Sequence, residues 1–269
     1  MPFHLSPCEI PYAGAICSRK DDAMSSLRPP PDVGATIELS SCIDSRVELH
    51  ARASRLMRAQ TPWEELANTA SAALGVAGAC AFALALLWHG DATIGQWIFA
   101  GAVLILFLTS TAYHALTAES AKELARMFDH VAIFVLIAAT YTPFALGPLY
   151  THGGILLFGL EWMMALIGLC FVLCKGHDSL WVSNALYILM GWLGLLFISD
   201  FIDYVPATGN WFILAGGVFY TAGVAFYSAR KLRFSHLVWH LFVLAGAICH
   251  AVAVYASSGW LDYQVSTMR

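Results

Sequence analysis

Seven long apolar runs alternate with short polar segments between residues 61 and 260. The hydrocarbon core of a bilayer is crossed by about 20 mainly apolar residues, which is close to the length of each run. None of the runs has the period-two alternation of a strand, and helices satisfy their own backbone groups within lipid. We therefore predict an all-α protein, a seven-transmembrane helical bundle. The predicted spans are 66–88, 94–116, 129–148, 153–174, 180–199, 210–229 and 236–257.

The basic residues orient this bundle in the membrane. Lysines and arginines precede the first span and occur in the connections after spans 2, 4 and 6, whereas the connections after spans 1, 3 and 5 have none. Of the 14 lysines and arginines, only Arg269 falls on the opposite side. Because cytoplasmic segments are enriched in basic residues, we expect the N-terminus in the cytosol and the C-terminus outside. An even number of spans would destroy this segregation.

Composition agrees with an integral, multi-pass protein of the plasma (inner) membrane. Hydrophobic residues make up 59% of the chain and charged residues 12%, with a mean hydropathy of +0.67. A soluble domain is about 25% charged, so this chain has too few charges to cover its apolar surface in water. The net charge of −4 gives no indication of binding to nucleic acid.

The two ends of the chain differ from the membrane domain at 61–260. Residues 1–60 contain the stretch PPPDV (29–33) and no apolar run typical of a signal peptide, so we predict a disordered cytosolic extension. Residues 261–269 form a short tail. The seven cysteines are irregularly spaced, and four lie in apolar runs, where cysteine acts as a small hydrophobe, so no disulfide framework is predicted.

Polar residues from three spans are predicted to meet at one membrane depth on the cytosolic side. Span 2 ends with Ser110 and His114, four positions apart and therefore on one helical face. Span 3 begins with Asp129. Span 7 begins with His236 and His240, again on one face. These residues are distant in sequence, and the topology brings them into one layer.

This set predicts a zinc site. Catalytic zinc commonly has three protein ligands and a water, and lowers the pKa of that water to about 7. His114, His236 and His240 would be the ligands, Asp129 a fourth ligand or the group that holds and deprotonates the water, and Ser110 a hydrogen-bond donor to the water or to a substrate carbonyl. Taken singly, an interfacial histidine often only extends toward water, and Asp129 could be the N-cap of span 3. Their coincidence at one depth favours the metal, because ionisable residues in spans are costly and tend to be functional.

Three blocks of sequence resemble signature motifs of the hemolysin III family. They are TSTAYHAL (109–116), FDHVAIFVLIAATYTPF (128–144) and FSHLVWHLFVLAGAICH (234–250). This family is the bacterial branch of the progestin and adipoQ receptor (PAQR) group, within a superfamily of membrane-bound metal-dependent hydrolases that includes alkaline ceramidases. The similarity covers about residues 61–257. It implies a zinc site formed by the residues that match the family motifs, which are Ser110, His114, Asp129, His236 and His240.

The chain departs from the family pattern near the first span. The family commonly has a histidine one position after Ser71, where this chain has Ala72. That histidine is outside the zinc set, so its loss puts in doubt only the role that it would have near this span.

Other polar residues within the spans have simpler interpretations. Glu161 lies near the middle of span 4, as part of a proton path or as a protonated, hydrogen-bonded structural acid. Glu64 and Glu65, with Asn68, are expected to cap the first span and complement its dipole, and the family resemblance also allows a role near the cytosolic mouth of the bundle. His250 lies deep in span 7, too far from the metal site to bind there, and is expected to be a satisfied interior histidine.

Three functions remain open from the sequence. The first is a zinc-dependent hydrolase of a lipid amide or ester, similar to a ceramidase, with a membrane lipid as substrate. The second, implied by the PAQR resemblance, is a zinc-stabilised receptor or regulator of membrane lipid homeostasis without catalysis. The third is a pore-forming hemolysin, as the family name implies, although no charged stripe that would line a wide channel is evident.

Overall fold

The computed structural model describes residues 60–175, 180–228 and 232–257. The predicted N-terminal extension up to residue 59 and the tail at 261–269 lie outside the described residues. Within them, seven helical segments are long and apolar enough to cross a membrane, which confirms the predicted number of spans. The helices are α2 (Pro62–His89), α3 (Ile94–Ala115), α4 (Glu119–Ala145), α5 (Ile155–Lys175, preceded by the π-helical turn Tyr150–Gly154), α6 (Leu180–Gly191), α7 (Ile198–Tyr204), α8 (Ala207–Ser228) and α9 (Ser235–Ala256).

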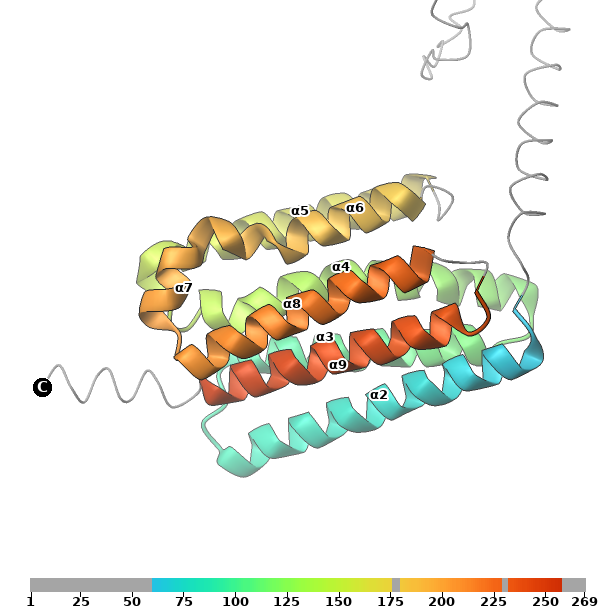
Figure 1. The fold of residues 1–269 in the computed structure, drawn as a ribbon, viewed down its shortest axis with the longest axis horizontal. Helices are drawn as coiled ribbons and strands as arrows, with labels where there is room; N and C mark the ends of the chain where they lie inside the picture. Colours follow the sequence, from blue (N-terminus) through green and yellow to red (C-terminus); the bar gives the residue numbers. More distant parts are fainter. Residues whose placement is uncertain (1–59, 176–179, 229–231, 258–269) are drawn as a thin grey trace, which may run out of the picture. The chain divides into compact units, whose positions relative to one another are not determined.

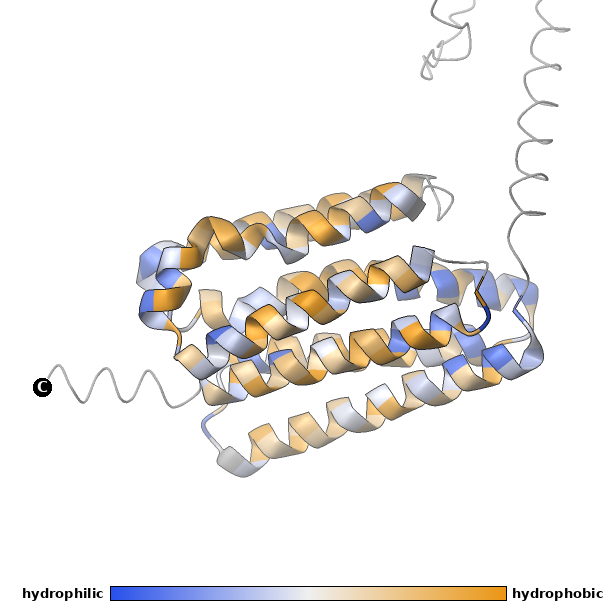
Figure 2. Ribbon diagram, in the orientation of Figure 1, coloured by the Kyte–Doolittle hydropathy of each residue, from blue (hydrophilic) through white to orange (hydrophobic). Residues whose placement is uncertain are grey.

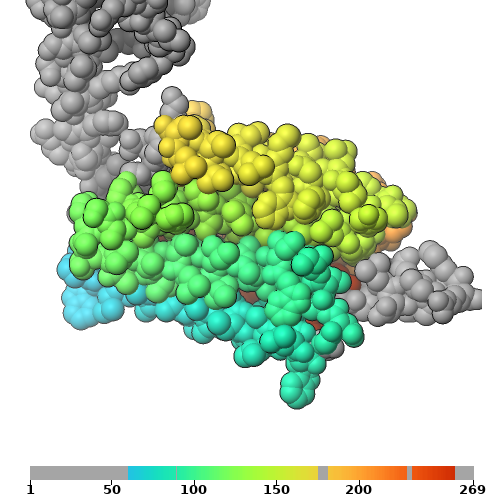
Figure 3. Space-filling model, turned by 180° about the vertical axis from the view of Figure 1, so that it is seen from behind, coloured from blue at the N-terminus to red at the C-terminus, as the bar shows by residue number. Residues whose placement is uncertain are grey.

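The helices run side by side (Figure 1), and α3, α4 and α9 are the most deeply buried of the described spans. Helix α8 packs along α9, α3 packs along both α2 and α4, and α5 packs on the outer side of α4. Seen from behind, α2 to α5 cover one face in chain order (Figure 3). Hydrophilic residues gather at the helix ends, most densely where α2, α4 and α9 begin (Figure 2). This is the end that the basic residues assign to the cytosol.

Helix α2 begins with a capping box. The Thr61 side chain accepts a hydrogen bond from the Glu64 backbone N–H, and the Glu64 carboxylate accepts one from the Thr61 N–H. Two backbone donors that the helix leaves unpaired are thereby satisfied. The expected capping role is therefore carried by Glu64, whereas Glu65 makes different contacts that are described with the site below. Gly90, with φ of 79°, ends the helix in the left-handed region.

Helix α4 begins ten residues before the predicted start of span 3. Its N-cap is Ala118, so the interpretation of Asp129 as an N-cap is wrong, and Asp129 lies within the helix. The first turns carry Glu119, Lys122 and Arg126. These residues are compatible with a helix, but their charge excludes them from the bilayer core. A search for apolar runs detects only the part of the helix within lipid and misses this extension toward water.

The fifth span is a broken helix rather than one continuous run. Helix α6 ends at Gly191, and a 3₁₀ turn at Leu193–Phe197 connects it to α7. The hydroxyl of Tyr141 on α4 donates to the Gly191 carbonyl at 2.6 Å and accepts from the Gly194 N–H at 3.3 Å. A break within the bilayer frees backbone groups that lipid cannot satisfy, and Tyr141 supplies partners for two of them.

Glycines allow α8 and α9 to pack closely around aromatic rings. A Cβ atom at Gly216 would overlap the ring of His250, and one at Gly246 would lie 2.8 Å from the ring of Tyr220. Small residues at membrane helix interfaces permit such close approach, which is the main source of attraction between helices in lipid.

We therefore predict that Gly216→Ala lowers the free energy of unfolding by about 1–3 kcal/mol, because the added methyl group overlaps the His250 ring. Gly159→Ala in α5 is the matched control, since a Cβ there meets nothing within 4 Å. Unfolding of both variants in detergent would be compared with the wild type. Equal stability of the two variants would contradict the proposed close packing.

Candidate metal centre

Three histidine side chains converge where α3 ends and α9 begins. His114 lies in the last turn of α3, and His236 and His240 lie in the first two turns of α9. Each offers one ring nitrogen, and these three atoms all lie within 4.8 Å of one another. The Nε2 atoms of His114 and His236 are 3.0 Å apart. His114 and His240 are buried, and His236 is partly buried, so the cluster has limited contact with water.

A carboxylate fixes the orientation of His114. Its Nδ1 lies 2.7 Å from Oε2 of Glu65 on α2, and the other oxygen of Glu65 accepts from Nζ of Lys122 on α4 at 2.8 Å. Because a carboxylate only accepts hydrogen bonds, Nδ1 carries the proton and Nε2 presents a lone pair to the cluster. Carboxylate–histidine pairs of this kind orient metal ligands and raise their basicity.

The backbone of α2 fixes His240 in the same way. Its Nδ1 lies 3.2 Å from the carbonyl oxygen of Asn68 and 2.9 Å from Oγ of Ser71, which itself donates to that carbonyl. A carbonyl only accepts, so Nδ1 again carries the proton and Nε2 is free of it. This Nε2 lies 3.3 Å from Oγ of Ser110 on α3.

His236 is supported by an aromatic side chain. Its ring lies 5.7 Å from the ring of Tyr227 on α8, measured between centroids. The Tyr227 hydroxyl is 3.2 Å from Nε2 of His130, whose Nδ1 donates to the Arg126 carbonyl at 2.8 Å. His130 therefore contacts the cluster indirectly, through Tyr227, although it is the neighbour of Asp129 in sequence.

The cluster could hold a metal ion. Two nitrogens bound at about 2 Å to a tetrahedral zinc lie roughly 3.3 Å apart, close to the 3.0 Å between the Nε2 atoms of His114 and His236. At His114 and His240, the outer ring nitrogen carries the proton and donates it to the partner oxygen, which leaves the inner nitrogen available as a ligand. The donor set and its supporting hydrogen bonds thus fit a metal that prefers imidazole.

The other two predicted site residues, Ser110 and Asp129, lie beside the cluster. Both are buried, and both line the same cavity. Asp129 does not belong to the group of ligand atoms within 4.8 Å, which contains only the three histidines among the described residues. Its role as a metal ligand stays a prediction, and the structure places its carboxylate next to Ser110.

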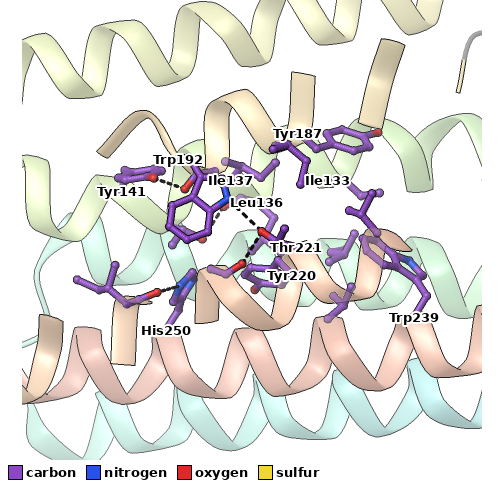
Figure 4. A pocket seen from close by; sticks show the side chains of 18 of the residues that line it. Ile133, Leu136, Ile137, Tyr141, Tyr187, Trp192, Tyr220, Thr221, Trp239 and His250 are labelled. Atoms are coloured by element: carbon purple, nitrogen blue, oxygen red, sulfur yellow. Dashed lines mark hydrogen bonds between the residues drawn. The ribbon is translucent and has the colours of Figure 1, made fainter. Parts of the chain in front are cut away.

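A cavity opens from this end of the site into the bundle. Its volume, as room for the centres of water molecules, is about 100 Å³, and it is lined by residues of α3, α4, α6, α7, α8 and α9. Ser110, Asp129 and His240 form part of its wall, and most of the remainder is aliphatic and aromatic (Figure 4). A largely apolar cavity with a few polar groups at one place is typical of a ligand site.

Sequence reasoning missed the supporting residues on α2 and α4. Glu65 and Asn68 were expected chiefly to cap the helix, with only a general role near the cytosolic mouth as the alternative. No role was predicted for Ser71, and Lys122 was counted only as a basic residue of the connection after span 2. The spacing of Glu65 and Asn68 by three residues puts them on one helical face at the depth of the histidines, and this signal could have identified them. The helices to which these side chains direct their hydrogen bonds could be determined only from the structure.

Glu161 does not have the partner expected of a structural acid. Its side chain is fully buried on α5, and neither carboxylate oxygen has a hydrogen-bond partner among the described residues. The hydroxyl of Tyr187 on α6 donates to the His130 carbonyl and does not bond Glu161.

The fold and the site define a seven-helix, integral multi-pass membrane protein with a histidine cluster at one end. The family described as Haemolysin-III related matches residues 64–251, and the chain belongs to this family, which confirms the resemblance found in the motifs. Membership also indicates the plasma membrane in a bacterium.

Relatives from distant organisms support the assignment. The chain is 34% identical to the Hemolysin-3 homolog of Bacillus subtilis (strain 168) over 190 residues, which cover 68% of this chain and 89% of that protein. It is 32% identical to the Hemolysin-3 of Bacillus cereus over 190 residues, covering 68% and 87%. It is 28% identical to the human Monocyte to macrophage differentiation factor over 172 residues, covering 60% and 69%.

We predict that Glu65→Gln weakens zinc binding about ten- to a hundredfold, because the amide is a poorer acceptor for the His114 Nδ1–H and leaves Lys122 without its carboxylate. Competition of the purified protein with a chelator of known affinity measures this change. Glu123→Gln is the control, since that half-exposed carboxylate pairs with Arg126 away from the cluster. An unchanged affinity in Glu65→Gln would show that Glu65 does not support a metal ligand.

Proposed function

We propose that the chain is a zinc-dependent hydrolase that cleaves an amide or ester bond of a membrane lipid. The observation that carries this proposal is the position of His240, one of the three clustered histidines, in the wall of a mainly apolar cavity that Ser110 and Asp129 also line. Lipid substrates combine a reactive carbonyl with a long apolar chain. The cavity offers a polar wall for the first and an apolar wall for the second.

The number of protein ligands favours catalysis over a purely structural metal. Structural zinc sites usually have four protein ligands, whereas catalytic sites have three and keep one position open. Here three imidazole nitrogens converge, and Asp129 lies outside this group. Zinc bound in this way supplies a Lewis acid that polarises a carbonyl and makes water a nucleophile at neutral pH.

The residues around the cluster have separate roles in this proposal. Asp129 acts as general base: it accepts the proton that the attacking water loses and returns it to the amine or alcohol that leaves as the amide or ester bond breaks. Ser110 lies beside Asp129 and 3.3 Å from Nε2 of His240. Its single O–H orients the Asp129 carboxylate before the reaction and would turn to the oxygen that gains charge at the substrate carbonyl. The Lys122–Glu65 pair keeps His114 directed at the cluster.

The rest of the cavity would accommodate the acyl chain. Leu106, Ile133, Leu136 and Val243 belong to its wall next to the polar end. An acyl chain enclosed there would remain in an apolar environment on leaving the bilayer, and its carbonyl would be held near the histidines. Binding energy from the chain would then position the reacting bond.

Two substitutions separate metal binding from chemistry. We expect His236→Ala to lose both zinc and lipid hydrolysis, because a ligand is removed. We expect Asp129→Asn to keep zinc and to lose turnover by about 10²–10⁴-fold, the usual contribution of a general base. Metal analysis and a screen of ceramide, phospholipid and acylglycerol hydrolysis would be performed on the same reconstituted samples.

His152→Ala is the matched control, since His152 stacks on Tyr204 in a different part of the molecule. Hydrolysis that survives in zinc-free His236→Ala would disprove the proposal.

A receptor or regulator in which zinc is structural is the second candidate. The cluster joins α3 to α9, so a bound metal would also stabilise the bundle, and the human relative is named as a differentiation factor. For such a protein, zinc removal would lower the melting temperature while the wild type would hydrolyse none of the lipids. Release of a trapped dye from liposomes would instead indicate the pore-forming activity implied by the name Hemolysin-3.

A further inference from the structure

A second polar pair lies in the wall of the cavity, away from the histidine cluster. It consists of Tyr220 on α8 and His250 on α9, whose ring centroids are 5.3 Å apart and whose planes meet at 64°. Both residues line the cavity (Figure 4). Neither residue is used in the hydrolysis proposed above.

Each member of the pair has a polar atom without a partner. The Tyr220 hydroxyl and Nδ1 of His250 are buried and have no hydrogen-bond partner among the described residues. Nε2 of His250 lies 3.2 Å from the Ile213 carbonyl, which only accepts, so Nε2 carries the proton and Nδ1 is an acceptor. The expectation that His250 is fully satisfied is therefore met at only one of its two nitrogens.

Both rings are accommodated by the helices around them. Gly216 faces the His250 ring and Gly246 faces the Tyr220 ring, each so closely that a Cβ would overlap. Buried polar atoms are nearly always paired with protein, water or ligand, because an unpaired one is costly. Apolar side chains of similar size would fill this space without that cost, so the two polar atoms call for a partner in the cavity.

The separation from the metal centre sets the length of a molecule that reaches both places. His250 follows His240 by ten residues on α9, and a helix rises 1.5 Å per residue, which gives about 15 Å along its axis. In Figure 4, Trp239, the neighbour of His240, and His250 lie at opposite ends of the view. An extended chain advances about 1.2 Å per bond, so roughly 12 bonds bridge this distance.

We propose that the cavity selects a hydroxylated acyl chain, with its carbonyl at the histidine cluster and a hydroxyl about 12 bonds away between Tyr220 and His250. A hydroxyl fits the pair because it donates to Nδ1 of His250 and accepts from the Tyr220 O–H. A saturated chain without this group leaves both protein atoms unpaired. This inference rests on the proposed function in one respect, that the cavity holds the acyl chain.

Binding of three fatty acids to the full-length, zinc-loaded protein in lipid nanodiscs tests the proposal. The probes are ω-hydroxydodecanoate, dodecanoate and β-hydroxydodecanoate, each of which presents a carboxylate, the product of hydrolysis, to the cluster. We expect ω-hydroxydodecanoate to bind about tenfold more tightly than the other two, because one buried hydrogen-bonding site is then filled. Displacement of a fluorescent fatty acid measures the three affinities.

The variants assign this preference to the pair. Tyr220→Phe keeps the ring and removes only the hydroxyl, and His250→Phe removes the acceptor; both should bind the three probes with equal affinity, at the level of dodecanoate. Tyr150→Phe is the matched control and should keep the preference, since Tyr150 is exposed and outside the cavity wall. If His250→Phe does not fold, Tyr220→Phe alone tests whether the preference depends on the pair.

Each remaining outcome has a defined meaning. Equal binding of all probes by the wild type, or no binding of any, overturns the inference, and equal binding would show that the pair holds only an ordered water. A preference that survives in Tyr220→Phe and His250→Phe overturns it as well. A clear preference with no lipid hydrolysis by the wild type would sustain the inference and contradict only the proposed enzymatic activity.

Discussion

Two neighbouring carboxylates at the start of α2 hold together the end of the bundle where the histidines meet. Glu64 caps its own helix and accepts from the backbone N–H of Phe234 at 2.8 Å, at the point where α9 begins. Glu65 binds His114 on α3 and Lys122 on α4. Consecutive helical positions point in directions about 100° apart, so two adjacent side chains reach three other helices. The geometry of the cluster depends on these contacts.

The contact with Phe234 also explains how α9 presents its histidines. Phe234 is the N-cap of α9 and adopts φ of 57°, in the left-handed region that side chains other than glycine seldom occupy. Such a conformation persists only where the surroundings enforce it, and the Glu64 carboxylate bonds its N–H. The turn starts α9 at Ser235, which places His236 in the first turn and His240 one turn deeper. The strained backbone of Phe234, its hydrogen bond to Glu64 and the positions of the α9 histidines are therefore coupled at one end of the bundle.

The seven spans and the common depth of the histidines could be predicted from the sequence, for identifiable reasons. Length and apolarity are imposed by the bilayer, and basic residues mark its cytosolic face, so His114, His236 and His240 could be assigned to one depth. The start of α4 and the break after Gly191 could not be predicted, because both depend on groups outside the apolar run: a polar helical extension and the Tyr141 hydroxyl. The roles of Glu65 and Asn68 depend on hydrogen-bond directions across helices, which spacing along one helix does not contain.

The central claim is that three imidazoles from α3 and α9 hold one zinc ion. Metal analysis of the purified wild type and His240→Ala, prepared with equal zinc and washed with the same weak chelator, tests it most directly. We expect about one zinc per wild-type chain and less than about a tenth of that in the variant, since loss of one of three ligands removes most of the affinity. Equal zinc in the two proteins, or none in the wild type, would contradict the account.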